Sequence, residues 1–252
     1  MRLQGLVGMS VGMWLGLGGM AQAATLTISI TNTTVGHPFK ALLIAAHGVN
    51  DHLFSSGYAA TAGLRALAEC GEQASLAAEL RAANPLVDVV GVESDAGLNK
   101  LMPGATISIG PLVVTDAANT RLSMAGRMMA TNDGFAGLEA VAIPAEPGAY
   151  AFDLLAFDAG TEANNELLPI IDGPCTVGDP YMGDQRADLS DDLYLGVNGT
   201  GAAAKEASVL NPSITIHRGV LGDSYAAGGL ADLDFAHHCW TNPVATVTVI
   251  VQ

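Results

Sequence analysis

The chain has 252 residues, of which 50% are hydrophobic and 14% are charged, a composition typical of a globular protein rather than a disordered one. Ten Lys and Arg residues against 25 Asp and Glu residues give a formal net charge of −15, which argues against binding to nucleic acid and to anionic lipid. Thirty glycines, 11 prolines and an aromatic content of 5% predict many turns and a core of small side chains. We therefore expect a single acidic domain that is rich in β-structure.

The first 23 residues have the features of an export signal. Arg2 precedes a short apolar stretch, broken by glycines, that runs to Leu17. Ala21-Gln22-Ala23 then has the small-x-small pattern that signal peptidase recognises. The apolar stretch is too short and too rich in glycine for a comfortable membrane span, and no later segment is apolar over about 18 residues. We predict a signal peptide over residues 1–23, no membrane span after its cleavage, and a secreted or periplasmic protein.

Alternating polar and apolar residues predict strands at both ends of the mature chain, residues 24–252. Residues 25–30 follow this pattern with β-branched side chains, and residues 244–251 follow it again near the C-terminus. The two terminal strands are expected to close one sheet system. Other short β-like runs are separated by Gly, Pro, Asp and Asn, as in a β-sandwich. They cover residues 106–109, 112–114, 122–129, 150–157 and 213–217.

Residues 61–83 break the β pattern. Four leucines have helical spacing there, and Gly71 is expected to divide the segment into two short helices. A later segment, from Gly173 to Leu210, is long, polar and rich in Gly and Asp, which is typical either of a functional loop or of a merely solvated one. No internal repeat and no shift in composition marks a second domain, so residues 24–252 are predicted to form one domain.

Three cysteines, Cys70, Cys175 and Cys239, allow at most one intramolecular disulfide, which an exported protein can form. The third thiol is then buried or free to pair elsewhere. A zinc knuckle or a thioredoxin-like site has no support, because no Cys-x-x-Cys spacing is present. Spacing alone does not say which two cysteines pair.

Three carboxylates beside predicted strands form the candidate site. Asp133 lies in an Asn-Asp-Gly turn, and Asp158 and Glu162 lie on one loop around Gly160. Ca²⁺ takes six to eight oxygen ligands at about 2.3–2.6 Å, and loops supply both carboxylate and backbone oxygens. The spacing also permits a purely structural role, in which Asp133 and Asp158 bond the backbone of their own turns. An EF-hand is excluded because its Asp-x-Asp-x-Asp-Gly ladder is absent.

Four motifs, in this order and spacing, closely resemble those of a bacterial spondin domain. They are Asn132-Asp133-Gly134-Phe135, Asp158-Ala159-Gly160-Thr161-Glu162-Ala163-Asn164, His217-Arg218-Gly219 and Trp240-Thr241-Asn242-Pro243-Val244-Ala245. The family is named for the N-terminal domain of the secreted matrix protein F-spondin, and the resemblance covers essentially the whole mature chain. It implies an all-β fold, an antiparallel C2-like β-sandwich with calcium bound among loops. The ligands carried over are Asp133, Asp158 and Glu162. The resemblance also implies a role in adhesion or extracellular interaction, with an unknown protein or glycan as the partner.

The chain departs from the family pattern at four positions. The resemblance implies Asp at one of them in the animal proteins of the family. Glu162 stands there in this chain, so its side chain is longer by one methylene. Cys70 and Cys239 stand where acidic residues are more usual in relatives, and two such replacements imply a matched pair, Cys70–Cys239. Cys175 resembles a cysteine of the family whose nearby partner is missing here.

The sharpest enzymatic alternative is a secreted hydrolase of the GDSL type. Gly222-Asp223-Ser224 and Asp234-Phe235-Ala236-His237 resemble the nucleophile motif and the Asp-x-x-His pair of that family. In that family the serine lies near the start of an α/β chain, far from its Asp-x-x-His pair, whereas nine residues separate Ser224 from Asp234 here. A structural alternative is that His217 and Arg218 form a hydrogen-bond or ion-pair corner, with Asp234 as a candidate partner.

Two other kinds of active site are weaker alternatives to a binding module. A zinc-dependent hydrolase would draw on His47, Asp51 and His52, with His237-His238 near the C-terminus. His47 is expected to end a strand, and adjacent histidines in an extended segment point to opposite faces, which argues against a shared metal. A glycosidase would use paired acids, but Trp240 is the only tryptophan left after signal cleavage to form a sugar platform. We therefore predict a non-catalytic, calcium-binding module.

Overall fold

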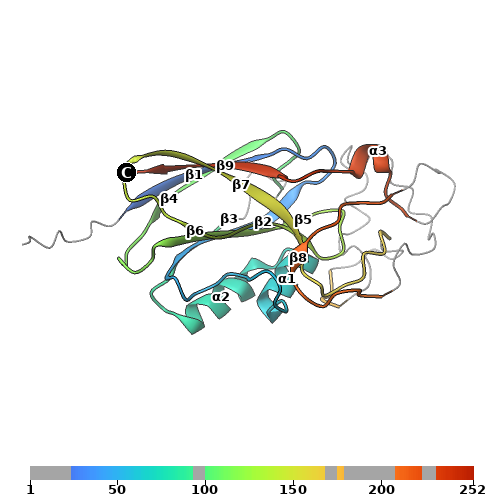
Figure 1. Cartoon of the computed structure of the whole chain (residues 1–252), viewed down its shortest axis with the longest axis horizontal. Coiled ribbons are helices and arrows are strands. Elements are labelled where there is room, and N and C mark those ends of the chain that lie inside the picture. The colour runs from blue at the N-terminus through green and yellow to red at the C-terminus, as the bar shows by residue number, and fades with distance from the viewer. Residues whose placement is uncertain (1–23, 93–99, 168–174, 179–207, 223–230) are drawn as a thin grey trace, which may run out of the picture.

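The computed structural model describes residues 24–92, 100–167, 175–178, 208–222 and 231–252, and the rest of the chain is a grey trace in Figure 1. The predicted signal peptide, most of the segment from Gly173 to Leu210 and the candidate nucleophile Ser224 lie outside these ranges. Within the ranges, every helix is too short or too polar to cross a membrane.

Nine strands in the described ranges form one sheet in which all pairings are antiparallel. The order along the sheet is β3-β2-β5-β6-β7-β9-β1-β4, and the short strand β8 pairs with β7. The strands are β1 (Thr25–Asn32), β2 (Phe39–His47), β3 (Asp88–Val92), β4 (Thr106–Val113), β5 (Arg121–Met128), β6 (Gly134–Ala142), β7 (Gly148–Asp158), β8 (Thr215–Ile216) and β9 (Ala245–Val251).

The sheet bends into two layers and nearly closes into a barrel. β7 belongs to both layers, because its residues 148–154 pair with β9 and its residues 155–158 pair with β6 (Figure 1). At the two ends of the strand order, β3 and β4 are in contact. There the Asp88 carboxylate accepts hydrogen bonds from the backbone N–H and the hydroxyl of Thr115, at 2.8 and 2.6 Å. The antiparallel all-β prediction is confirmed, and the C2-like sandwich stays a prediction.

The two terminal strands lie side by side and supply much of the inner core. β1 and β9 pair from Leu26 opposite Val251 to Asn32 opposite Ala245, which confirms that both ends of the mature chain share one sheet. Apolar side chains on one face of each strand are buried between the layers, whereas the alternating Thr and Ser residues lie on the outer face. The period of two in the sequence therefore corresponds to inside and outside of the barrel.

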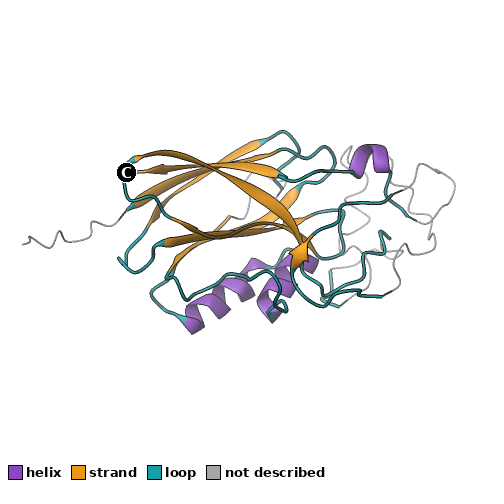
Figure 2. Ribbon diagram, in the orientation of Figure 1, coloured by secondary structure: helices purple, strands orange, loops and turns teal. Residues whose placement is uncertain are grey.

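Two helices cover the outer face of the layer formed by β2, β5 and β6 (Figure 2). They are α1 (Ala62–Cys70) and α2 (Gln73–Ala83), and they confirm the predicted helical insertion. Gly71 ends α1 in the left-handed conformation, with φ 68°, which explains the break between the helices. Leucines of both helices pack with Leu43 of β2 and Phe135 of β6 in a second apolar core.

A disulfide joins Cys70, at the end of α1, to Cys175, with their Cα atoms 5.5 Å apart. The pairing Cys70–Cys239 implied by the family pattern is therefore wrong, and Cys239 is a free thiol. The physical reason is position. Cys70 lies on the helix-covered side of the barrel, whereas Cys239 directly follows the short helix α3 (Phe235–His238), which lies on the opposite side (Figure 1).

Candidate functional site

Asp133 and Asp158 lie close together because β6 and β7 pair where β6 begins and β7 ends. This end of the barrel is called the loop end. Asp133 directly precedes β6, Asp158 is the last residue of β7, and Gly134 lies opposite Asp158 in the ladder. The Thr131 hydroxyl accepts a hydrogen bond from the Gly134 N–H at 3.0 Å, which closes the turn before β6. The Ala159 N–H donates to the carbonyl oxygen of Asp133 at 3.2 Å. Strand pairing thus places two acidic loops against each other.

The Asp133 carboxylate is fully buried, and its two oxygen atoms differ in their surroundings. Oδ2 accepts hydrogen bonds from the N–H and hydroxyl of Thr161, at 2.7 and 3.2 Å, and from the Glu162 N–H at 3.0 Å. Oδ1 is also buried, and no described residue donates a hydrogen bond to it. A buried carboxylate oxygen without a donor is costly, and a bound cation would offset that cost.

The ionisation of Asp133 is strongly disfavoured at this position. Burial is the main cause, and the negative charge of Asp158 is the second; together they raise the pKa of Asp133 from 3.8 to about 7. Hydrogen bonds from Thr161 and Glu162 favour the charged form but do not compensate. A positive ion beside the two carboxylates would shift the balance back to the ionised form.

Asp158 lies at the wall of a small pocket next to this pair. Its carboxylate accepts hydrogen bonds from the Gly160 N–H at 2.8 Å and from the Asn164 amide at 2.5 Å. The pocket has a volume of about 150 Å³. Its lining includes the oxygen-bearing side chains of Asp158, Glu162, Asn164, Asn211 and Thr215, and the cationic side chain of Arg218. Side chains that can ligate calcium therefore gather here from two distant parts of the chain.

The three predicted ligands are brought near one another in part. Asp158 is close enough to Asp133 for its charge to raise the pKa of Asp133, and Asp158 and Glu162 line the same pocket. Within the described ranges, however, no three His, Cys, Asp or Glu side chains are arranged to hold a metal ion. The donor set fits calcium in its chemistry, since carboxylates and amides line the pocket and Oδ1 of the neighbouring Asp133 lacks a donor among the described residues.

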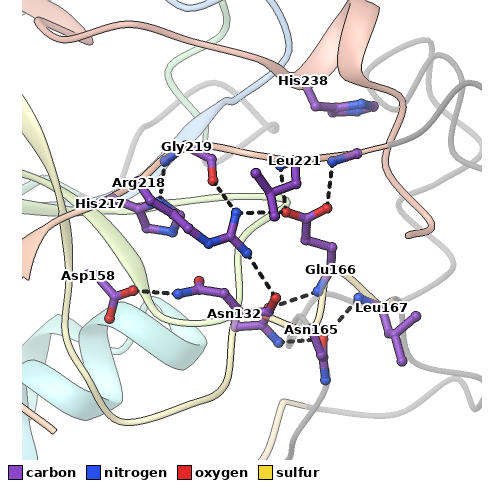
Figure 3. A network of polar contacts seen from close by, with 12 residues as sticks. Asn132, Asp158, Asn165, Glu166, Leu167, His217, Arg218, Gly219, Leu221 and His238 are labelled. Carbon is purple, nitrogen blue, oxygen red and sulfur yellow. Dashed lines mark hydrogen bonds and ion pairs between the residues drawn. The ribbon is translucent and has the colours of Figure 1, made fainter. Parts of the chain in front are cut away.

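A second polar network, which was not predicted, lies beside the pocket and centres on Glu166 (Figure 3). Glu166 is buried and has a positive φ of 58°. Its carboxylate accepts hydrogen bonds from the N–H groups of Leu221 and Gly222, both at 2.7 Å, and forms an ion pair with Arg218 at 3.2 Å. The only feature of the local sequence that could have indicated a role for Glu166 is its place at the end of the polar run that follows Asp158.

Asn132 joins this network to the Asp133 turn. Its amide donates to the side-chain oxygen of Asn165 at 2.9 Å, and its own oxygen accepts from the Glu166 N–H at 3.4 Å (Figure 3). The predicted corner at His217 and Arg218 exists, with Glu166 as the ionic partner of Arg218. The loop after β7 is thereby anchored to both the turn before β6 and the segment after β8.

The family model for the spondin N-terminal domain matches residues 32–166, from the end of β1 to Glu166. The chain belongs to the spondin N-terminal domain family. This is a family of extracellular, non-enzymatic domains, and the matched range contains all three predicted ligands. A search of curated proteins found no match.

His37 and His217 of the spondin domain are buried and have structural partners. Burial, followed by the charges of Arg218 and His37, lowers the pKa of His217 to about 3. Its Nδ1 accepts a hydrogen bond from the Gly219 N–H at 3.0 Å, so the neutral ring carries its proton on Nε2. His37 is fully buried against Trp240, with ring centroids 4.5 Å apart. These rings pack the loop end of the barrel.

His47 and Asp51, two residues of the zinc hypothesis, have other contacts in the spondin domain. His47 Nε2 lies 2.8 Å from the Ser123 hydroxyl, and burial is the main cause that lowers its pKa. The Asp51 carboxylate accepts hydrogen bonds from the Gly48 N–H at 3.1 Å and from the Asn84 amide at 2.9 Å. His52 is exposed and lines a different pocket.

The acid of the hydrolase hypothesis caps a helix. Asp234 is the N-cap of α3, where its carboxylate accepts a hydrogen bond from the Ala236 N–H at 2.8 Å. The backbone carbonyl of the same residue accepts from the His237 N–H at 3.2 Å. These contacts describe a local helix start of the usual kind.

Proposed function

We propose that this protein is an exported spondin-type module that binds Ca²⁺ through Asp133, Asp158 and Glu162. The observation that carries the proposal is the buried Asp133 carboxylate, whose Oδ1 lacks a donor among the described residues and whose neighbour is a second carboxylate. Two such groups are stabilised together by a divalent cation. Calcium suits oxygen ligands on loops and tolerates irregular geometry.

The ion would have a structural role and would take no part in a reaction. Asp133 precedes β6, Asp158 ends β7, and Asn211 and Thr215 of the pocket lining belong to the segment around β8. A cation at this point would hold three segments in one arrangement at the loop end of the barrel. We propose that this ordered loop end, on a C2-like frame, binds an extracellular protein or glycan in adhesion.

The first test is the thermal stability of the purified protein in EDTA and in calcium. Calcium sites of extracellular modules bind at roughly 0.1–1 mM, and saturation at about 100 times the dissociation constant adds about 2.7 kcal/mol. For a domain of this size the unfolding midpoint should rise by about 5–10 °C.

Asp158→Asn, which keeps the size of the side chain, should abolish this rise. The matched control is Asp153→Asn, because Asp153 is an exposed residue of the same strand and its replacement should leave the calcium effect unchanged. A folded wild-type protein with no calcium effect would refute the site, and so would an equal effect in Asp158→Asn.

A further inference from the structure

A larger pocket lies away from the three carboxylates, between α1, β6 and the loop that joins β2 to α1. Its volume is about 550 Å³, within the range of about 300–1,000 Å³ that is usual for small-molecule sites. The lining consists of His52, Leu53, Phe54, Ser55, Ser56, Tyr58, Ala59, Thr61, Leu64, Glu139 and Ile214. None of these residues belongs to the proposed calcium site, so this inference stands apart from that proposal.

The floor of the pocket is apolar and firmly held. Leu53, Phe54 and Leu64 are all nearly fully buried. The Phe54 ring makes edge contacts with the rings of Phe135 and Phe157, each with centroids 5.0 Å apart. Because these side chains belong to the second core, the floor exists before any ligand arrives.

The wall of the pocket is also fixed, by backbone hydrogen bonds. The Gly57 N–H donates to the carbonyl oxygen of Ile214, and the Ile214 N–H donates to the carbonyl oxygen of Tyr58, both at 2.8 Å. This exchange resembles a single rung of a β-ladder and joins the loop before α1 to the start of β8. Tyr58 is 72% exposed and lines the pocket.

The polar end of the pocket is a carboxylate. Glu139 of β6 accepts hydrogen bonds from the Ser56 N–H at 3.1 Å and from the Ser56 hydroxyl at 2.9 Å. These two contacts hold the carboxylate in place, and each oxygen retains a lone pair for a further contact. A fixed carboxylate at the edge of an apolar floor suits a ligand with one cationic group and one apolar body.

The N-terminus of α1 does not reverse this charge preference. The start of a helix carries a partial positive charge that would favour an anion. Here, however, the Gly63 N–H in the first turn donates to the Glu79 carboxylate of α2 at 2.8 Å. The carboxylate offsets the charge of the helix end, and the chain as a whole carries −15.

We propose that this pocket binds a small organic cation with an apolar body. The cationic group lies at Glu139 and against the face of Tyr58, and the body covers the floor of Leu53 and Phe54 beside the wall at Ile214. Aromatic rings attract such cations through their negatively polarised faces.

Benzyltrimethylammonium is a suitable probe, because its charge does not change with pH and it has an aromatic body. We expect a dissociation constant of about 1 mM for a ligand of this size. Amide chemical-shift changes in the ¹⁵N-labelled protein should be centred on Ser56, Gly57, Tyr58 and Ile214. Benzyl alcohol, which is neutral, and phenylacetate, which is anionic, should bind at least about 10-fold more weakly.

Two variants separate charge from fold. Glu139→Gln keeps an acceptor for Ser56 and removes the charge, and it should weaken binding of the probe at least about fivefold. Glu146→Gln makes the same charge change at an exposed residue between β6 and β7, and it should leave binding within about twofold.

The proposal is overturned if benzyl alcohol binds as tightly as the ammonium, if Glu139→Gln binds as well as the wild type, or if the probe causes no shifts at 10 mM. Shifts at the same amides from a lysine-rich peptide, without shifts from the free ammonium, would overturn the small-ligand assignment in favour of a basic protein partner. Calcium should be kept constant throughout, so that failure of the calcium site and failure of this pocket are read separately.

Discussion

The pKa of Asp133 makes a quantitative prediction about how stability depends on pH. A carboxyl group with a pKa of about 7 in the folded state and 3.8 in the unfolded state keeps its proton longer when folded. The free energy of unfolding is therefore highest, as far as this group is concerned, below about pH 3.8. It falls as the pH rises from there to about 7. At about 1.36 kcal/mol per pH unit, the loss over the whole interval amounts to about 4 kcal/mol.

Asp133→Asn removes this titration with little change in size. We compare how the free energy of unfolding, measured with urea in EDTA, changes from pH 5 to pH 8. This change should be more favourable for the variant than for the wild type by about 2–3 kcal/mol. Because the difference between the two pH values is taken for each protein separately, any pH-independent effect of the amide on stability cancels. The other carboxylates contribute equally to both proteins. Asp153→Asn, on the exposed face of β7, should follow the wild-type pH profile.

Calcium should stabilise the wild type and have little effect on the stability of Asp133→Asn. Because the ion binds the ionised carboxylates, its stabilising effect on the wild type should be small at pH 5 and should reach its full size above about pH 7. Asp133→Asn should show little calcium effect at either pH. Parallel pH profiles for wild type and variant in EDTA would show that Asp133 is not held in its neutral form. That result would remove the physical reason for placing a cation there.

Two further predictions concern stability alone. The Cys70–Cys175 disulfide spans a sequence separation of 105 residues, so Cys70→Ser should lower the free energy of unfolding by about 4–5 kcal/mol in urea, and an equal loss in Cys239→Ser would contradict the assignment. Glu166→Gln leaves buried donors without a charged acceptor and should cost about 2–3 kcal/mol by calorimetry. Glu146→Gln is the exposed control, and a Glu166 variant as stable as this control would show that the network adds nothing.

Strands with alternating polar and apolar residues were predicted, whereas of β2 only the end at His47 was predicted. In β2, Leu42 and Ile44 face the inside of the barrel, while Leu43 and Ala45 face α1 and α2. Its sequence is therefore a continuous apolar run, and such a run has no periodicity that would separate a strand from a buried helix. β6 was missed for another reason. A Cβ at Gly137 would lie 2.8 Å from the ring of Phe54, so packing selects a residue of low strand propensity.

Only part of the site is local in sequence. The turn at Asp133 and the loop after Asp158 follow from their Gly, Asn and Asp residues, which is why both were predicted. Their meeting depends on the register of β6 against β7, and the role of Glu166 depends on donors 55 and 56 residues further along the chain. No local pattern specifies such distant partners, and the same holds for the disulfide.

Residues 211–216 connect the two proposed sites physically. A Cβ on Gly160, which has φ 71°, would lie 2.7 Å from the carbonyl oxygen of Asn211, so the acidic loop packs directly on this segment. Next along the chain, Ile214 forms the pocket wall, and Thr215 pairs with Asp158 in the ladder between β7 and β8. An ion that orders the loop around Asp158 therefore also restrains the wall beside Tyr58. Because free-energy coupling is reciprocal, a ligand against that wall restrains the calcium loop in turn.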